Sequence, residues 1–288
     1  MRGIDFYSYR MFIRAAVVAF QNFKNCHGFL PSLDNPRTFN ENILFRKLFA
    51  EHRMPSLSNK LASREYVRRL LGDRFVTEIS WVGKTVDGLW TFPIPPGRYF
   101  LKANHGSGFN LQLDLPKDLV ERRDEIINVT RHWMETKFNL HAGEWQYSTY
   151  EPRLFLEKFL DLKGDSAPDD YKFYCFDGKP KMILYIDGRF VDIRRSYFDT
   201  AWTMYPVTVD DEPPRTAPVE KPILLSEMLR LASEISKEFD FVRVDFYSDG
   251  KRRIVFGELT FTPGDSLNKF SDPAFDLHVG ALFKELGR

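Results

Sequence analysis

Short runs of β-branched and aromatic residues, separated by turn residues, constrain the fold of this chain most strongly. Between residues 98 and 195 these runs read RYFLKA, RLFLEKF, YKFYCF and KMILYI, a composition typical of strands. Asp177-Gly178 and Asp187-Gly188 follow the last two runs, and Asp-Gly pairs favour hairpin turns. Because hairpins join antiparallel neighbours, we predict antiparallel sheets.

Helical patterns flank these strands and complete an α+β fold class. Residues 57–71 place apolar side chains on one helical face, and Gly72 is expected to end that helix. Further helices are expected within 118–138 and 224–239. We therefore divide the chain into a mainly helical region, a strand-rich region and a C-terminal region with a helix and a hairpin: 1–97, 98–195 and 196–288.

Composition excludes some partners. The 41 Lys and Arg residues against 40 Asp and Glu leave a net charge of +1, so no overall field would attract nucleic acid. The only cysteines, Cys26 and Cys175, form neither a disulfide framework nor a metal-spaced cluster, which fits a cytoplasmic protein.

The apolar segment Met11 to Phe23 is too short to span a bilayer, and Arg14 interrupts it. We expect a helix packed on the core, with peripheral membrane contact as the alternative.

The segment from Phe241 to Gly264 reads as two strands around a turn, with Asp245 on the first and Glu258 on the second. A two-residue turn at Asp249-Gly250 would leave the two carboxylates about 13 Å apart. A loop of residues 250–253 would place them directly opposite, with Cβ atoms about 5 Å apart. Arg243 and Thr260 would share their face. Such a group suits a Mg²⁺-bound polyphosphate, and a hairpin of solvated charges is the alternative.

Two further segments carry candidate chemistry. In FLKANHGSGFN, Lys102 lies on a strand that leads into Gly106, Ser107 and Gly108, whose backbone N–H groups could turn toward an anion. A merely flexible turn is the alternative, and His105 is expected to hydrogen-bond within the loop. The segment RLFLEKFL reads by itself as a buried strand with a charged end at Glu157.

Taken together, the segments resemble the ATP-grasp enzymes, and among them the TupA-like branch associated with bacterial cell-surface polysaccharide (teichuronic acid type) biosynthesis. The resemblance runs from about Asn35 to Gly280. It is carried by NPRTFNENILFRKL, NKLASREYV, FLKANHGSG, EWQY, PRLFLEKFL, DYKFYCFDGK and FVRVDFY followed by FGELTFTPG. It implies a nucleotide held between two antiparallel α+β subdomains, a lid at 98–195 and a metal-binding subdomain at 196–288. It also favours the loop of residues 250–253 in the C-terminal hairpin.

The resemblance also implies roles for individual residues. Lys102 would contact ATP phosphates under the loop of Gly106, Ser107 and Gly108, and Arg243 would hold the transferred phosphate. Glu157, Lys158, Phe159 and Leu160 would form the hinge beside adenine. Asp245 and Glu258 look like the Mg²⁺ ligands, and Thr260 stands where many relatives have asparagine, which puts a second metal ion in question. Lys60, Asp170 and Lys172 resemble further nucleotide contacts, with solvated surface charges as the alternative.

The activity implied by the resemblance is ATP- and Mg²⁺-dependent activation of a carboxylate as an acyl phosphate, followed by displacement of phosphate by an amine or another nucleophile. The substrate would be a small molecule or a saccharide. Two other classes stay open: a glycosyltransferase of the same pathway, and a non-catalytic nucleotide-binding module. The aromatic segment from Ser196 to Pro206 is expected either to line a sugar site or to pack in the core.

Overall fold

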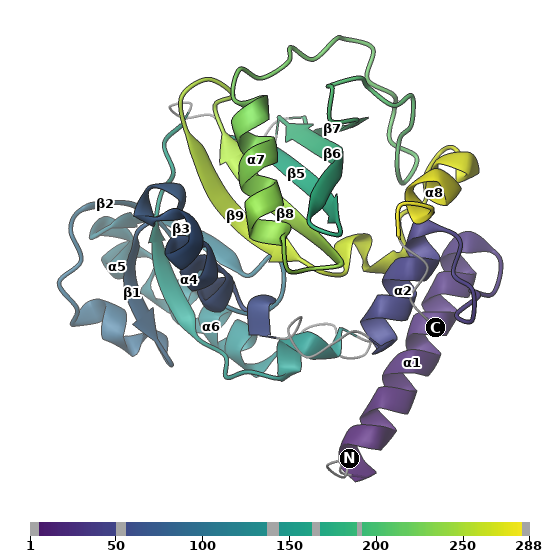
Figure 1. Cartoon of the computed structure of the whole chain (residues 1–288). Helices are drawn as coiled ribbons and strands as arrows, with labels where there is room; N and C mark the ends of the chain where they lie inside the picture. Colours follow the sequence, from purple (N-terminus) through teal and green to yellow (C-terminus); the bar gives the residue numbers. More distant parts are fainter. Residues whose placement is uncertain (1–5, 50–55, 137–143, 163–167, 189–191, 284–288) are drawn as a thin grey trace.

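Two antiparallel sheets organise the molecule, with a helix between them (Figure 1). The computed structural model describes residues 6–49, 56–136, 144–162, 168–188 and 192–283. The predicted α+β class with antiparallel strands is confirmed. Residues of both sheets line one cavity, and several of the predicted site residues are among them.

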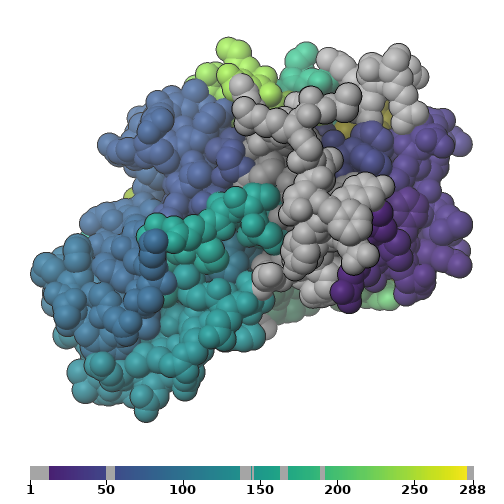
Figure 2. All heavy atoms as spheres, turned by 90° about the horizontal axis from the view of Figure 1, so that it is seen from below, coloured from purple at the N-terminus to yellow at the C-terminus, as the bar shows by residue number. Residues whose placement is uncertain are grey.

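The smaller sheet consists of β1 (Ile79–Gly83), β2 (Gly97–Ala103), β3 (Asn110–Leu115) and β4 (Leu154–Lys158). These strands pair in the order β1-β4-β2-β3. Helices α5 (Lys117–Glu121) and α6 (Arg123–Glu135) cover it, so the single helix predicted within 118–138 is broken at Arg122, and residues 137 and 138 lie outside the described part. Viewed from below, the blue to teal residues of this sheet and its helices form a lobe beside the rest of the molecule (Figure 2).

The larger sheet consists of β5 (Asp169–Phe176), β6 (Lys179–Asp187), β7 (Arg194–Phe198), β8 (Phe241–Ser248) and β9 (Ile254–Thr260). These strands pair in the order β7-β6-β5-β8-β9. Helix α7 (Leu225–Ser236) packs on one face through Met228, Leu231 and Ile235. On the other face, α2 (Phe39–Phe49) and α8 (Pro273–Gly280) enclose an aromatic cluster around Phe39 and Phe241.

Strand pairing divides the chain differently from the predicted boundaries. β1 lies within residues 1–97 yet belongs to the smaller sheet, and β5, β6 and the first two residues of β7 lie within 98–195 yet belong to the larger one. The boundary predicted at residue 195 is therefore wrong, because β5 pairs with β8 along its whole length and cannot be separated from it. The chain passes from one sheet to the other between Lys158 and Asp169.

The two predicted Asp-Gly turns have different outcomes. Asp177 and Gly178 have φ of 46° and 71°, as a two-residue hairpin turn with both central residues left-handed requires, so this turn is confirmed. The second prediction is wrong, because Asp187 still pairs with Arg194 and remains part of the ladder. The connection therefore runs over residues 188–193, of which 189–191 are outside the described part.

Helix α4 (Lys60–Leu71) lies between the sheets and positions several site residues (Figure 1). Gly72, at φ 94°, ends it as predicted, whereas its start is set by Asn59, whose side chain accepts a hydrogen bond from the Leu61 N–H at 2.9 Å. The Arg64 guanidinium pairs with Glu157 on β4 and also donates to the Gly257 carbonyl on β9 at 3.4 Å. One side chain thus connects the helix to both sheets.

The predicted N-terminal helix is present as α1 (Phe6–His27). Phe23 is buried against Leu44 and Leu48 of α2, as expected for a helix packed on the core, while Val17 is 63% exposed. In the part of the chain that the structure describes, no helix has both the length and the apolar character needed to cross a membrane. Membrane contact through α1 stays a prediction.

Candidate active site

The register of the larger sheet aligns the candidate residues in a row across one face. Glu258 on β9 pairs with Asp245 on β8, Asp245 pairs with Lys172 on β5, and the row continues through Leu184 on β6 to Tyr197 on β7. Directly paired residues have Cβ atoms about 5 Å apart on the same face of a sheet. The sheet therefore presents two carboxylates and an ammonium group side by side.

The pairing of Asp245 with Glu258 is confirmed, but the predicted way of reaching it is wrong. The loop runs over residues 249–253, one residue longer than predicted, because Ser248 pairs with Ile254. The Asp249 carboxylate accepts hydrogen bonds from the backbone N–H groups of Lys251 and Arg252 at 2.9 and 2.8 Å, which holds this longer loop.

A β-bulge at Gly257 corrects the register between the loop and the site. Phe246 pairs with Phe256, yet Asp245 pairs with Glu258, so β9 carries one extra residue at this point. Without the bulge Asp245 would face Gly257, and Glu258 would point to the opposite face of the sheet. A Cβ atom at Gly257 would lie 3.2 Å from the Asp245 carbonyl oxygen, so glycine suits the close approach.

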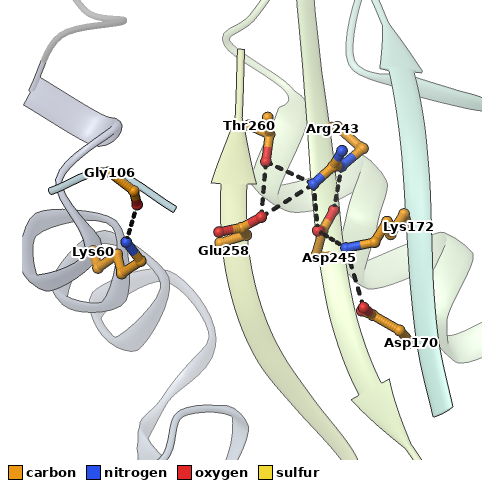
Figure 3. A network of polar contacts seen from close by, with 8 residues as sticks. All are labelled: Lys60, Gly106, Asp170, Lys172, Arg243, Asp245, Glu258 and Thr260. Carbon is orange, nitrogen blue, oxygen red and sulfur yellow. Dashed lines mark hydrogen bonds and ion pairs between the residues drawn. The ribbon is translucent and has the colours of Figure 1, made fainter. Parts of the chain in front are cut away.

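Arg243 ties the two carboxylates together (Figure 3). Its guanidinium donates to both oxygens of Asp245 at 2.7 Å, to Glu258 Oε1 at 3.1 Å and to the Thr260 hydroxyl at 2.9 Å. Lys172 approaches from β5, with Nζ 2.5 Å from Asp245 Oδ2 and 3.2 Å from Asp170 Oδ2. Asp170 is thus buried beneath Lys172, and its predicted role as a direct nucleotide contact has no support in this geometry.

The buried members of this network keep their charges. Burial by itself would raise the pKa of Asp245, but Arg243 and Lys172 lower it below its ordinary value. Burial would lower the pKa of Lys172, but Asp170 and Asp245 raise it. The Arg243 guanidinium also has a raised pKa, because the attraction of Asp245 outweighs the effect of its burial. Ion pairing therefore fixes the charge state of the network near neutral pH.

Glu258 has an oxygen open to a magnesium ion that also binds substrate phosphates, whereas both oxygens of Asp245 are engaged by Arg243 and Lys172. Glu258 has a side chain 41% exposed, and its Oε2 accepts no hydrogen bond from the described residues. Nowhere in the described ranges do three or more His, Cys, Asp or Glu side chains gather into a metal-binding group. A site of one or two carboxylates completed by phosphates and water is nevertheless what Mg²⁺ commonly uses. The Thr260 hydroxyl is engaged by Arg243 and Glu258.

A second charged cluster is on the smaller sheet. Glu157 is 4% exposed and pairs with Lys102 on β2 and with Arg64 on α4. Burial would raise its pKa, but Arg64 and Lys102 lower it to about 2. Glu157 is therefore not an exposed strand end, whereas Lys158 points outward. Sequence reasoning missed Arg64, although it stands four residues after Lys60 and thus on the same face of a helix.

Lys60 and the glycine loop are in direct contact. The Lys60 ammonium donates to the Gly106 carbonyl, and burial lowers its pKa to about 8. Gly106 and Gly108 have φ of 69° and 76°, so this loop uses the left-handed backbone conformation open to glycine. His105 hydrogen-bonds the Trp133 carbonyl at 3.0 Å, in keeping with its expected structural role. Lys60 is consequently a partly buried cation rather than a solvated one.

Two adjoining cavities lie along these groups. The smaller, of about 150 Å³, has aromatic and apolar walls and is lined by Thr77, Phe100, Lys102, Asn110, Glu157, Lys158, Phe159, Leu160, Pro168 and Tyr247. The larger, of about 430 Å³, is polar, and its lining includes Lys60, Arg64, Lys102, Ser107, Gly108, Lys172, Arg243 and Glu258. Lys102, Asn110 and Tyr247 line both, so the cavities meet there. No sequence pattern distinguishes Asn110 or Tyr247 from other strand residues.

The aromatic segment from Ser196 to Pro206 is mainly core. Phe198 and Trp202 stack with ring centroids 4.2 Å apart beneath α7, and only Tyr197 lines the larger cavity.

Near the end of β9, Thr262 donates to Glu144 at 3.0 Å and accepts from Gln146 at 3.3 Å, both in the EWQY segment. That segment therefore fixes the chain just beyond the carboxylate pair.

A family model described as TupA-like ATPgrasp matches residues 41–284. No curated protein is similar to the chain in sequence. Among solved structures, an L-amino acid ligase from Bacillus licheniformis has 12% identity and a TM-score of 0.47, with 87% of this chain and 55% of that chain covered. A D-alanine-D-alanine ligase from Helicobacter pylori has 14% identity and a TM-score of 0.45, with coverage of 81% and 60%. This chain thus spans little more than half the length of these proteins.

Proposed function

Because the chain belongs to the TupA-like ATP-grasp family, we propose that it is an ATP- and Mg²⁺-dependent ligase that activates a carboxylate. The observation that carries this proposal is the pair of adjoining cavities. One has the aromatic and apolar walls that suit a purine, and the other gathers six cations with the exposed carboxylate of Glu258: Lys60, Arg64, Lys102, Lys172, Arg195 and Arg243.

Each part of the site has a proposed role. Phe100 and Phe159, stacked with centroids 5.6 Å apart, would hold the base beside the backbone of residues 157–160. Lys60 and Lys102 would bind the phosphates where the cavities meet. Asp245 and Glu258 would hold Mg²⁺, which supplies charge neutralisation on the phosphate oxygens when bound.

Arg243 would orient and stabilise the transferring phosphoryl group. It stands beside the carboxylate pair, and its charge is fixed by Asp245. A substrate carboxylate oxygen would form a bond to the γ-phosphorus as the bond to the bridging oxygen breaks and ADP leaves. A nucleophile would then attack the acyl carbon, and inorganic phosphate would leave. Fixed cations around the transferring group are the main source of catalysis in such reactions.

The pathway and setting are proposed on the family resemblance. We propose that the carboxylate or its acceptor belongs to bacterial cell-surface polysaccharide synthesis, in the cytoplasm. A glycosyltransferase or a non-catalytic module remains the alternative, and the polar cavity beside β8 and β9 favours phosphate transfer over both.

Thermal unfolding with ligands tests the proposal. We expect Mg²⁺-ATP to raise the unfolding temperature in a concentration-dependent way, because a ligand at 100 times its dissociation constant stabilises the native state by about 2.7 kcal/mol. UDP-glucose at equal concentration should have no effect. A shift with UDP-glucose and none with ATP would favour the glycosyltransferase, and ATP binding that no acid substrate ever converts into ADP release would favour the module.

The pKa of Lys60, about 8, predicts a pH-dependent ATP affinity. In the free protein Lys60 loses its proton as the pH rises through 8, so phosphate binding at higher pH requires a proton to be taken up. We expect the dissociation constant of an ATP analogue to rise above pH 8 by up to about tenfold per pH unit. Lys60→Arg, which stays charged, should give a flatter profile between pH 7 and 9.5. Superimposable profiles for the two proteins would contradict the role of Lys60.

A further inference from the structure

The larger cavity extends well beyond the groups assigned to the nucleotide. Its far end is formed by β6, β7 and the segments that follow, and it is lined by Leu184, Ile186, Arg195, Tyr197, Val209, Asp210 and Asn268. None of these residues has a role in the proposed phosphate transfer. Those on β6 and β7 lie on the opposite side of β5, with Lys172 and Tyr174, from the carboxylate pair.

Arg195 is the cation at this end of the cavity. On β7, Arg195 pairs with Ile186 of β6. Ile186 pairs with Asp170 of β5, and Asp170 pairs with Tyr247 of β8. Three strand spacings therefore separate Arg195 from β8, or about 14 Å at 4.8 Å per spacing. The apolar side chains of Leu184 and Ile186 lie on β6 between them. The floor of the cavity thus carries Lys172 and Arg243 at one end, the apolar strip of Leu184 and Ile186 in the middle, and the guanidinium of Arg195 at the other end.

The Arg195 guanidinium forms an ion pair through one nitrogen and has two nitrogens without a partner among the described residues. One terminal nitrogen of Arg195 pairs with Glu212, and among the described residues no partner engages its Nε or its other terminal nitrogen. The side chain is 37% exposed. The nearby acid Asp210 is turned toward the backbone, where its Oδ1 accepts from the Lys269 N–H at 3.3 Å. Glu212 thus fixes one side of the guanidinium, and Arg195 lines the cavity with donors that no described residue engages.

We propose that this end of the cavity is an anion subsite, in which Arg195 binds a second anionic group of the acid substrate. This inference rests on the proposed ligase function and narrows its substrate class to elongated acids with two anionic groups. A planar guanidinium with adjacent free N–H donors matches a carboxylate or phosphate better than any other group. The strip of Leu184 and Ile186 would contact the apolar portion between the two anionic groups.

Dicarboxylic acids of graded length are suitable probes. Suberate, azelate and sebacate would be compared with monocarboxylates of equal carbon number, by calorimetric binding to the full chain with Mg²⁺ and a non-hydrolysable ATP analogue. We expect at least one diacid to bind roughly ten- to a hundredfold more tightly than its monoacid, as a charged hydrogen-bonded pair provides. Arg195→Gln should abolish that difference, and Arg195→Lys should retain part of it.

Arg194 offers a matched control on the same strand. It neighbours Arg195, so its side chain points to the other face, where it pairs with Asp192. Arg194→Gln should keep the full preference for diacids. Equal binding of diacids and monoacids to the wild type, no binding of any probe, or a preference that survives in Arg195→Gln would each overturn the proposal. Thermal shifts with Mg²⁺-ATP on the same proteins test the ligase function separately, because Arg195→Gln should leave them unchanged.

Discussion

Glu258→Gln is expected to lower ATP turnover by about 10²–10³-fold, the loss typical when a fixed group that stabilises the transferring charge is removed. Glu258 supplies the more exposed carboxylate of the pair, and its Oε2 is the oxygen open to a metal ion. Glutamine keeps the shape and the contact with Arg243 but lacks the negative charge. Turnover would be measured as ADP release with Mg²⁺ present, alongside the unfolding temperature.

Glu227→Gln is a matched control for this variant. Glu227 lies on α7, its side chain is 38% exposed, and like Glu258 it accepts hydrogen bonds from an arginine, Arg230. It should retain wild-type turnover, because it lies on the helix that covers the other face of the larger sheet. A folded Glu258→Gln protein that releases ADP at the wild-type rate would exclude Glu258 from the metal site.

Glu157→Gln is expected to reduce the free energy of unfolding by about 3–5 kcal/mol, because it leaves buried cations without their counter-charge. The Arg64 side chain is 7% exposed and that of Lys102 is 20% exposed, so water can compensate only in part. Urea unfolding would measure the loss. The double variant with Arg64→Gln should recover part of it, since one of the buried charges is then removed as well.

A neighbouring surface pair provides the control. Lys158 and Glu78 are 3.8 Å apart with side chains 60% and 68% exposed, so Glu78→Gln should change stability by less than about 0.5 kcal/mol. The folded pKa of Glu157, about 2, lies below its ordinary value, so its contribution is present above about pH 4.3 and is lost as the pH falls toward 2. Equal losses in Glu157→Gln and Glu78→Gln would refute a stabilising role for the buried cluster.

The elements of the fold were predictable because their signals are local. Alternating apolar residues, the Asp177-Gly178 turn and the glycine after α4 each act within a few residues, and each prediction agrees with the structure. Sheet membership depends on contacts between distant segments. The pairing of β5 with β8 joins residues about 70 positions apart in the chain, and no local pattern encodes it.

The candidate site was predictable to a similar extent. Facing carboxylates and the glycine loop follow from strand alternation and the family resemblance. The bulge at Gly257 does not, because a single glycine in a strand marks many different features. Arg195 is also indistinguishable in sequence from a surface arginine, and Arg64 is marked only by its spacing of four residues from Lys60. Only the packing of α4 against both sheets, and of β7 beside the cavity, assigns them a place.

The bulge also separates the tip of the last hairpin from the carboxylate pair. The alignment of Asp245 with Glu258 is set at Gly257, whereas the tip at residues 249–253 begins four positions after Asp245, ends five positions before Glu258 and exposes Lys251 and Arg252. Protein engineering can exploit this separation. A peptide tag or a fluorescent label inserted between Lys251 and Arg252 would be carried by the outer ladder from Ser248 to Phe246, and the register inside the bulge would be preserved.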